Sequence, residues 1–107
     1  MNALQLVDSK GPRETTVVGL NFVNLLGPGE TISGCSFYCE VRSGQGDPNP
    51  SLMLVGSPDL SSAPWVLQTV QGGVDGTTYL ITAVVTTSNP ANSPEGGLLL
   101  PVRKGGS

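Results

Sequence analysis

"GTTYLITAVVTTS", residues 76–88, is the most regular stretch of the chain, and it indicates how the chain folds. Its residues alternate between two faces of an extended strand. The apolar face holds Tyr79, Ile81, Ala83 and Val85; the mixed face holds Thr78, Leu80, Thr82, Val84 and Thr86. One apolar and one mixed face are typical of a strand that packs on one side only. We therefore expect residues 76–88 to contain a core strand of a β-sheet.

Several other segments show the same alternation, with Gly- and Pro-rich turns between them. The expected strands are residues 15–22, 31–41, 52–56, 65–70 and 98–102, with a short extended piece at 4–7. Within 31–41 the better core face is Ser33, Cys35, Phe37, Cys39 and Val41. A type II turn is expected at Gly27-Pro28-Gly29. Turn signals recur about every 8–12 residues, and no segment shows the period of a helix. This pattern predicts an all-β antiparallel sandwich of about six or seven strands.

The segments between these strands are polar and rich in Gly and Pro. We expect loops at 42–51 and 88–97, and either a loop or an edge strand at 57–64. The expected organisation is an N-terminal arm at 1–13, one sandwich domain at 14–104 and a C-terminal tail at 105–107. Because binding residues concentrate on loops and free ends, we expect the contact surfaces at the termini and at 42–51 and 88–97.

Two aromatic residues carry specific expectations. Tyr79 follows the turn residue Gly76 and opens the strand, which is the position of a tyrosine corner, where the hydroxyl bonds to backbone upstream. The alternative is a tyrosine placed there only for its β-propensity. Trp65 is expected to be the core tryptophan of the sandwich, and the alternative is an exposed anchor.

Charge argues against nucleic acid and membranes as partners. The formal net charge is −3, whereas phosphate contacts need clustered Lys and Arg. The basic residues are Lys10, Arg13, Arg42, Arg103 and Lys104, which we interpret as solubilising charges near the ends. The first residues lack the features of a secretory signal, and no window approaches the length of a membrane span.

The composition also argues against catalysis, cofactors and metals. The chain has no histidine, and its eight carboxylates are scattered along the sequence. "GQGDPNP", residues 44–50, has one carboxylate and lacks the spaced acidic ligands of a calcium loop. Cys35 and Cys39 are too few for structural zinc and are expected to be reduced, half-buried thiols. We therefore expect a binding or assembly protein and no enzyme, with no catalytic, cofactor-binding or metal residues.

Two motifs resemble a known family. They are Pro28-Gly29-Glu30-Thr31-Ile32 in "LGPGETISG" and Gly76-Thr77-Thr78-Tyr79 in "GVDGTTYLITAVVTTS", followed by "LLLPVRK" near the end. Together they resemble neck, collar or fiber-tail adaptor proteins of tailed bacteriophages, which have an immunoglobulin-like fold. The departures from that pattern are Cys35, Cys39 and the "GDPNP" loop. They leave open which partner the middle of the molecule contacts.

The resemblance implies a structural virion protein that is made in the bacterial host cytoplasm. Its partners would be connector, tail or fibre subunits and further copies of itself, held by contacts around the neck or upper tail. Two alternatives remain open: a capsid decoration or cement protein, and a carbohydrate-binding or adhesive immunoglobulin-like module. The small number of aromatic residues argues against the carbohydrate-binding or adhesive module, because such modules expose several aromatic side chains that stack on sugar rings.

Overall fold

The computed structural model describes residues 4–6 and 10–103, and within them the chain forms seven strands and two short 3-10 helices. The elements are β1 (Leu4–Leu6), β2 (Thr15–Asn21), η1 (Val23–Leu25), β3 (Ile32–Gly44), η2 (Pro50–Met53), β4 (Leu54–Asp59), β5 (Trp65–Gln71), β6 (Thr77–Thr87) and β7 (Glu95–Val102). The predicted all-β class is therefore confirmed.

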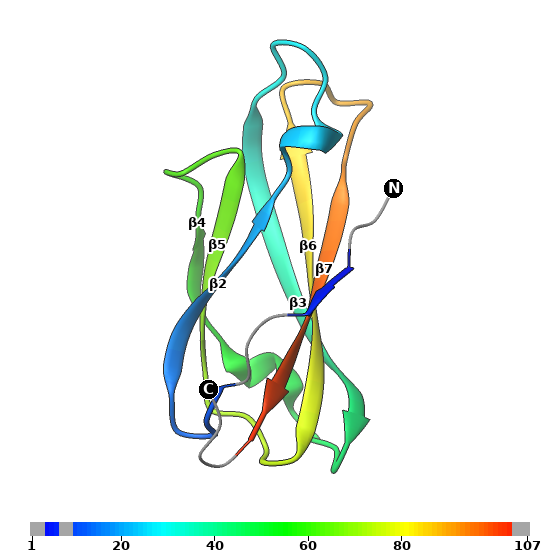
Figure 1. The fold of residues 1–107 in the computed structure, drawn as a ribbon. Coiled ribbons are helices and arrows are strands. Elements are labelled where there is room, and N and C mark those ends of the chain that lie inside the picture. Colours follow the sequence, from blue (N-terminus) through cyan, green and yellow to red (C-terminus); the bar gives the residue numbers. More distant parts are fainter. Residues whose placement is uncertain (1–3, 7–9, 104–107) are drawn as a thin grey trace.

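The strands form two sheets that pack face to face (Figure 1). One sheet has the order β1-β7-β6-β3 and the other the order β2-β5-β4. β1 runs parallel to β7, whereas every other pair of neighbouring strands is antiparallel. The result is a β-sandwich, as the spacing of the turns predicted.

The core lies between the sheets, and β6 is its centre. Tyr79, Ile81, Ala83 and Val85 are all fully buried, so the predicted inward face of this strand is confirmed. The opposite sheet contributes Val18, Leu20, Val66 and Val70. Burying each large apolar side chain contributes about 1.5–3 kcal/mol, which makes this layer the main source of stability.

The predicted core face of β3 is correct except at its first residue. Phe37 and Cys39 are buried, and Cys35 and Val41 pack against the core. Ser33 is exposed, because a register shift between Ile32 and Gly34 interrupts the alternation and turns the Ile32 side chain toward the core instead.

Three strand boundaries differ from the sequence prediction. β3 continues through residues 42–44, which were expected to be loop. β4 starts at Leu54, because residues 50–53 form η2, and it extends to Asp59 as an edge strand. β7 begins at Glu95, because Gly96 and Gly97 pair with β6. A Cβ on Gly96 would lie 3.4 Å from the Phe22 ring, an ordinary van der Waals distance, so the ring packs directly against this strand.

The expectation that Trp65 is the core tryptophan is wrong, since its side chain is 44% exposed. The buried positions of β5 are Val66, Gln68 and Val70, which leaves Trp65 on the outer face. The buried Gln68 is accommodated by hydrogen bonds from its Nε2 to the carbonyls of Val55, Gly56 and Thr69, at 2.9, 3.3 and 3.1 Å.

Candidate interaction surfaces

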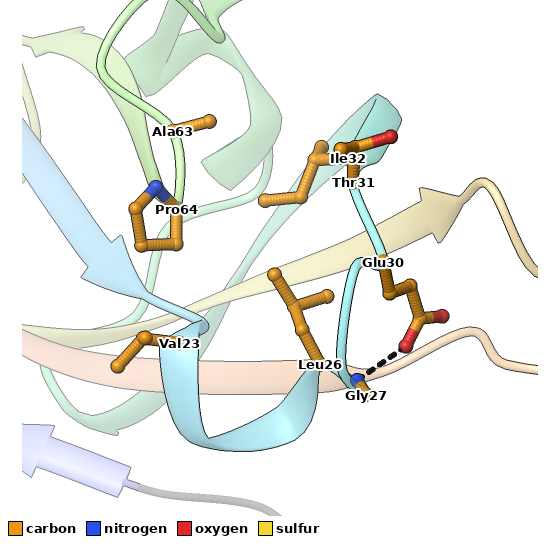
Figure 2. Close-up of a pocket in the computed structure, with 8 residues that line it drawn as sticks. All are labelled: Val23, Leu26, Gly27, Glu30, Thr31, Ile32, Ala63 and Pro64. Carbon is orange, nitrogen blue, oxygen red and sulfur yellow. Dashed lines mark hydrogen bonds between the residues drawn. The ribbon is translucent and has the colours of Figure 1, made fainter.

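The Pro-Gly turn before β3 forms as predicted. The amide of Glu30 donates to the carbonyl of Gly27 at 3.0 Å. Gly29 has φ +74°, as the third residue of a type II turn requires. The Glu30 side chain then folds back, and its Oε1 accepts from the amide of Gly27 at 2.5 Å (Figure 2). The turn is therefore closed by both the backbone and the side chain of Glu30.

The same carboxylate connects this turn to the loop between β6 and β7. Its Oε2 accepts a short hydrogen bond from the hydroxyl of Thr87 and a 2.9 Å bond from Nδ2 of Asn92. The Asn92 amide also donates to the carbonyl of Leu25 at 3.2 Å. The hydrogen bond from Thr87, with those from Gly27 and Asn92, lowers the pKa of Glu30. The carboxylate is thus charged at neutral pH and holds two loops that are far apart in sequence.

Beside this network lies a groove of about 370 Å³. Its lining is mostly apolar and comes from three segments: Val23, Leu26, Gly27, Glu30, Thr31, Ile32, Ala63 and Pro64. Figure 2 shows Leu26, Ile32 and Pro64 around a common space, with the Glu30 carboxylate turned toward Gly27. The groove combines apolar walls with an anchored carboxylate, an arrangement suited to holding an apolar side chain of a partner.

The sequence prediction missed most of this groove. It singled out the Pro28–Ile32 motif and the loop at 88–97, and the structure brings them together. It assigned no role to Val23, Leu26 or Pro64. The available signal was the segment at 22–26, apolar except for Asn24, which precedes a turn without continuing the alternation of a strand.

At the opposite end of the sandwich, the predicted tyrosine corner is confirmed. The Tyr79 hydroxyl accepts from the amide of Val74 at 2.8 Å and donates to Oδ2 of Asp47 at 2.8 Å. Asp47 also accepts from the amide of Asn49 at 2.9 Å, so the corner anchors the loop after β3. Burial raises the pKa of Tyr79 to about 12.

The interpretation of the basic residues as solubilising charges is wrong for Lys10. Its side chain is buried, and Nζ donates to the carbonyls of Gly11 and Gly72, both at 2.6 Å. Burial lowers the pKa of this amine. Arg13, Arg42 and Arg103 are exposed, whereas Lys104 lies outside the described residues.

The cysteines are packed thiols. Neither forms a disulfide; Cys39 is buried and Cys35 is half-buried. Burial raises the pKa of Cys35 to about 11 and that of Cys39 to about 12, so both thiols are protonated at neutral pH. Within residues 4–6 and 10–103, no three His, Cys, Asp or Glu side chains are grouped to hold a metal ion.

Exposed apolar side chains lie on both outer faces. Val17 and Trp65 belong to the outer face of the β2-β5-β4 sheet. On the other outer face, Tyr38 is 58% exposed and lines a shallow hollow of about 360 Å³ with Thr82 and Val84. In the part of the chain that the structure covers, no helix is long and apolar enough to cross a bilayer.

The fold and these surfaces define a small β-sandwich protein with a preorganised apolar groove at one end. A family model described as "Podophage GP4 fiber-tail adaptor protein gp77" matches residues 10–93. The chain belongs to this family of podophage fiber-tail adaptors, and it is accordingly a structural component of a phage tail. No curated protein and no solved structure matches the chain.

The matched range contains both motifs on which the resemblance was based, and so confirms it. It spans β2 to β6 and ends before β7. The "LLLPVRK" segment lies beyond it.

Proposed function

We propose that this protein attaches tail fibres to the neck or upper tail of a podophage, as a collar or fiber-tail adaptor. It acts by protein–protein contacts, in several copies, and without catalysis. The observation that carries the proposal is the family match over residues 10–93, which includes both the groove-forming turn and the tyrosine corner. The connector, tail and fibre subunits are the proposed partners, and the host cytoplasm is the proposed site of synthesis.

We also propose that the sandwich is immunoglobulin-like. Its strand order, β1-β7-β6-β3 facing β2-β5-β4, corresponds to A′GFC facing BED if the strands are lettered in sequence. Tyr79 then lies near the start of strand F, where the tyrosine corner of that fold occurs. The loops around the groove would be those after strands B, D and F, which lie at one end of such a sandwich.

The groove is the proposed contact with the fibre subunit. Glu30 is the charged residue that lines it, and the half of the sandwich around it carries no described Lys or Arg. A matching occupant is an extended fibre segment with an apolar side chain next to a basic one. The apolar side chain would fill the space between Leu26 and Pro64, and the basic one would lie near Glu30.

The test is complementation of a phage that does not make this protein. We expect its particles to have tails without fibres, and the wild-type chain supplied in trans should restore the fibres. Leu26→Asp, which places a charge in the groove, should fold but fail to restore them. The control is Leu52→Asp, since Leu52 is 74% exposed on η2 and lies outside the groove.

Cryo-electron microscopy of the complemented particles supplies the second measurement. Density for the chain between tail and fibre is expected. Density on the head surface would contradict the adaptor role and favour a capsid decoration protein. Equal restoration by Leu26→Asp and wild type would refute the role of the groove while leaving the adaptor role standing.

A further inference from the structure

The loop between β6 and β7, residues 88–94, contacts the Pro-Gly turn without lining the groove. The residues that line the groove come from 23–32 and 63–64. The loop is joined to the turn by a pair of hydrogen bonds. The Thr31 amide donates to Oγ of Ser88 at 3.0 Å, and the Ser88 amide donates to the carbonyl of Thr31 at 2.8 Å. The loop therefore supports the wall of the groove from behind.

Asn92 is the residue of this loop that fixes the backbone on both sides of Leu26. Its side-chain amide has two hydrogens, which go to the carbonyl of Leu25 at 3.2 Å and to Oε2 of Glu30 at 2.9 Å. The other oxygen of Glu30 accepts from the Gly27 amide (Figure 2). The carbonyl before Leu26 is thus held directly by Asn92, and the amide after it is held through Glu30.

Thr87, the last residue of β6, holds the same carboxylate. Its side chain is 8% exposed, and its hydroxyl accepts from the Asn89 amide at 3.1 Å. The hydroxyl hydrogen can reach the carbonyls of Asn89 and Asn92 at 3.0 and 3.2 Å, but Oε2 of Glu30 is the nearest acceptor and the charged one. The carboxylate then accepts three of about four possible hydrogen bonds, which leaves one position for a donor from a partner.

These hydrogen bonds matter because burial does not hold the turn. Gly27, Pro28 and Gly29 are all exposed, so few packing contacts keep this segment in one conformation. Hydrogen bonds to a carboxylate are roughly twice as strong as neutral ones. A site that is already held in its binding conformation loses less conformational freedom when a partner binds, and its affinity is higher for that reason.

We propose that Asn92 and Thr87 are positioning residues for the groove. They hold the Glu30 carboxylate and the backbone around Leu26, so that the groove exists before its partner arrives. The loop at 88–94 then controls the affinity of a groove that it does not line. This inference deepens the proposed contact with the fibre subunit and rests on that part of the proposed function.

The first test uses nuclear magnetic resonance of the purified full chain. Asn92→Ala removes both amide donors, and Thr87→Val removes the hydroxyl at nearly constant volume. Each should speed hydrogen exchange of the Gly27 amide by about tenfold. Each should also raise the pKa of Glu30 toward its ordinary value, because the lost donor stabilised the charged form. Thr87→Ser keeps the hydroxyl and should leave both measurements as in the wild type.

Two control variants separate positioning from a general loss of stability. Asn24→Ala makes the same substitution at an exposed residue of η1 that does not line the groove. Tyr79→Phe removes a buried hydroxyl at the opposite end of the sandwich. Neither should change the exchange of Gly27 or the pKa of Glu30.

The second test is the complementation assay. Asn92→Ala should need about tenfold more protein than the wild type to give the same share of particles with fibres. The proposal is overturned if Asn92→Ala leaves Gly27 exchange and the Glu30 pKa unchanged. It is also overturned if Asn92→Ala restores fibres at the wild-type amount. In that case failure of Leu26→Asp would leave the groove as the fibre contact, whereas full restoration by Leu26→Asp would remove the role of the groove as well.

Discussion

Replacing Tyr79 with phenylalanine tests the tyrosine corner, because it removes one oxygen atom and leaves the buried ring in place. The hydroxyl accepts from the Val74 amide and donates to the Asp47 carboxylate, both at 2.8 Å. A neutral hydrogen bond contributes about 0.5–1.5 kcal/mol and one to a charged group about 1.5–3 kcal/mol. We therefore expect Tyr79→Phe to lower the free energy of unfolding by about 2–4 kcal/mol.

The assay is urea unfolding followed by far-ultraviolet circular dichroism. The midpoint should fall while the denaturant slope stays constant, since the surface exposed on unfolding hardly changes. Thermal unfolding should show a midpoint lower by about 10–20 °C. The matched control is Tyr38→Phe, because Tyr38 is 58% exposed on an outer face, and we expect it to change stability by less than about 0.5 kcal/mol.

A double-mutant cycle with Asp47→Ala separates the two hydrogen bonds. Because both variants remove the same Tyr79–Asp47 contact, their effects should not add, with a coupling of about 0.5–3 kcal/mol. If Tyr79→Phe unfolded at the same urea concentration as Tyr38→Phe, the hydroxyl would have no structural role, and this reasoning would be refuted.

Two further predictions concern β3 and its surroundings. Gly44 has φ +102°, and a Cβ there would lie 2.1 Å from the carbonyl oxygen of Gly76, so Gly44→Ala should cost more than about 3 kcal/mol. Gly46→Ala, at φ +89° but in open space, should cost about 1–2 kcal/mol, and equal urea midpoints for the two variants would contradict the clash. Folding raises the pKa of Cys39 from 9.0 to about 12, so the folded state opposes ionisation of this thiol. The contribution of this buried thiol to the free energy of unfolding should therefore be fully present below about pH 9 and be lost as the pH rises from there toward 12. A urea midpoint that stayed constant from about pH 8 to about pH 10.5 would contradict this prediction.

Much of the fold could be predicted because a strand's side-chain period is local. Alternation alone identified the inward face of β6, and it located β2 and β5 to within a residue at each end. The prediction was weakest where glycines are involved. Residues 42–44 and 95–97 looked like loop, but both are paired strand, and Gly96 lies buried against the Phe22 ring. Glycine favours turns when a segment is considered alone, whereas within a sheet its backbone can still pair with a neighbouring strand.

The candidate surfaces were predicted only in part. The Pro28–Ile32 motif and the loop at 88–97 were identified, yet nothing local indicated that the Glu30 carboxylate joins them or that Pro64 completes the groove. The burial of Lys10 was also missed. Its two carbonyl partners are Gly11 and Gly72, and the second is distant in sequence.

The amino-acid sequence by itself determined most of the strands, the inward face of β6, the Pro-Gly turn and the tyrosine corner, because each depends on residues that are close together along the chain. Only the tertiary structure decided which segments became neighbours. It turned Trp65 outward once Val66 and Val70 faced the core, assembled the groove from the β2–β3 and β4–β5 connections, and left the edge of β2 open because β1 pairs with β7. These features follow from the packing of one sheet on the other, and no short stretch of sequence contains that information.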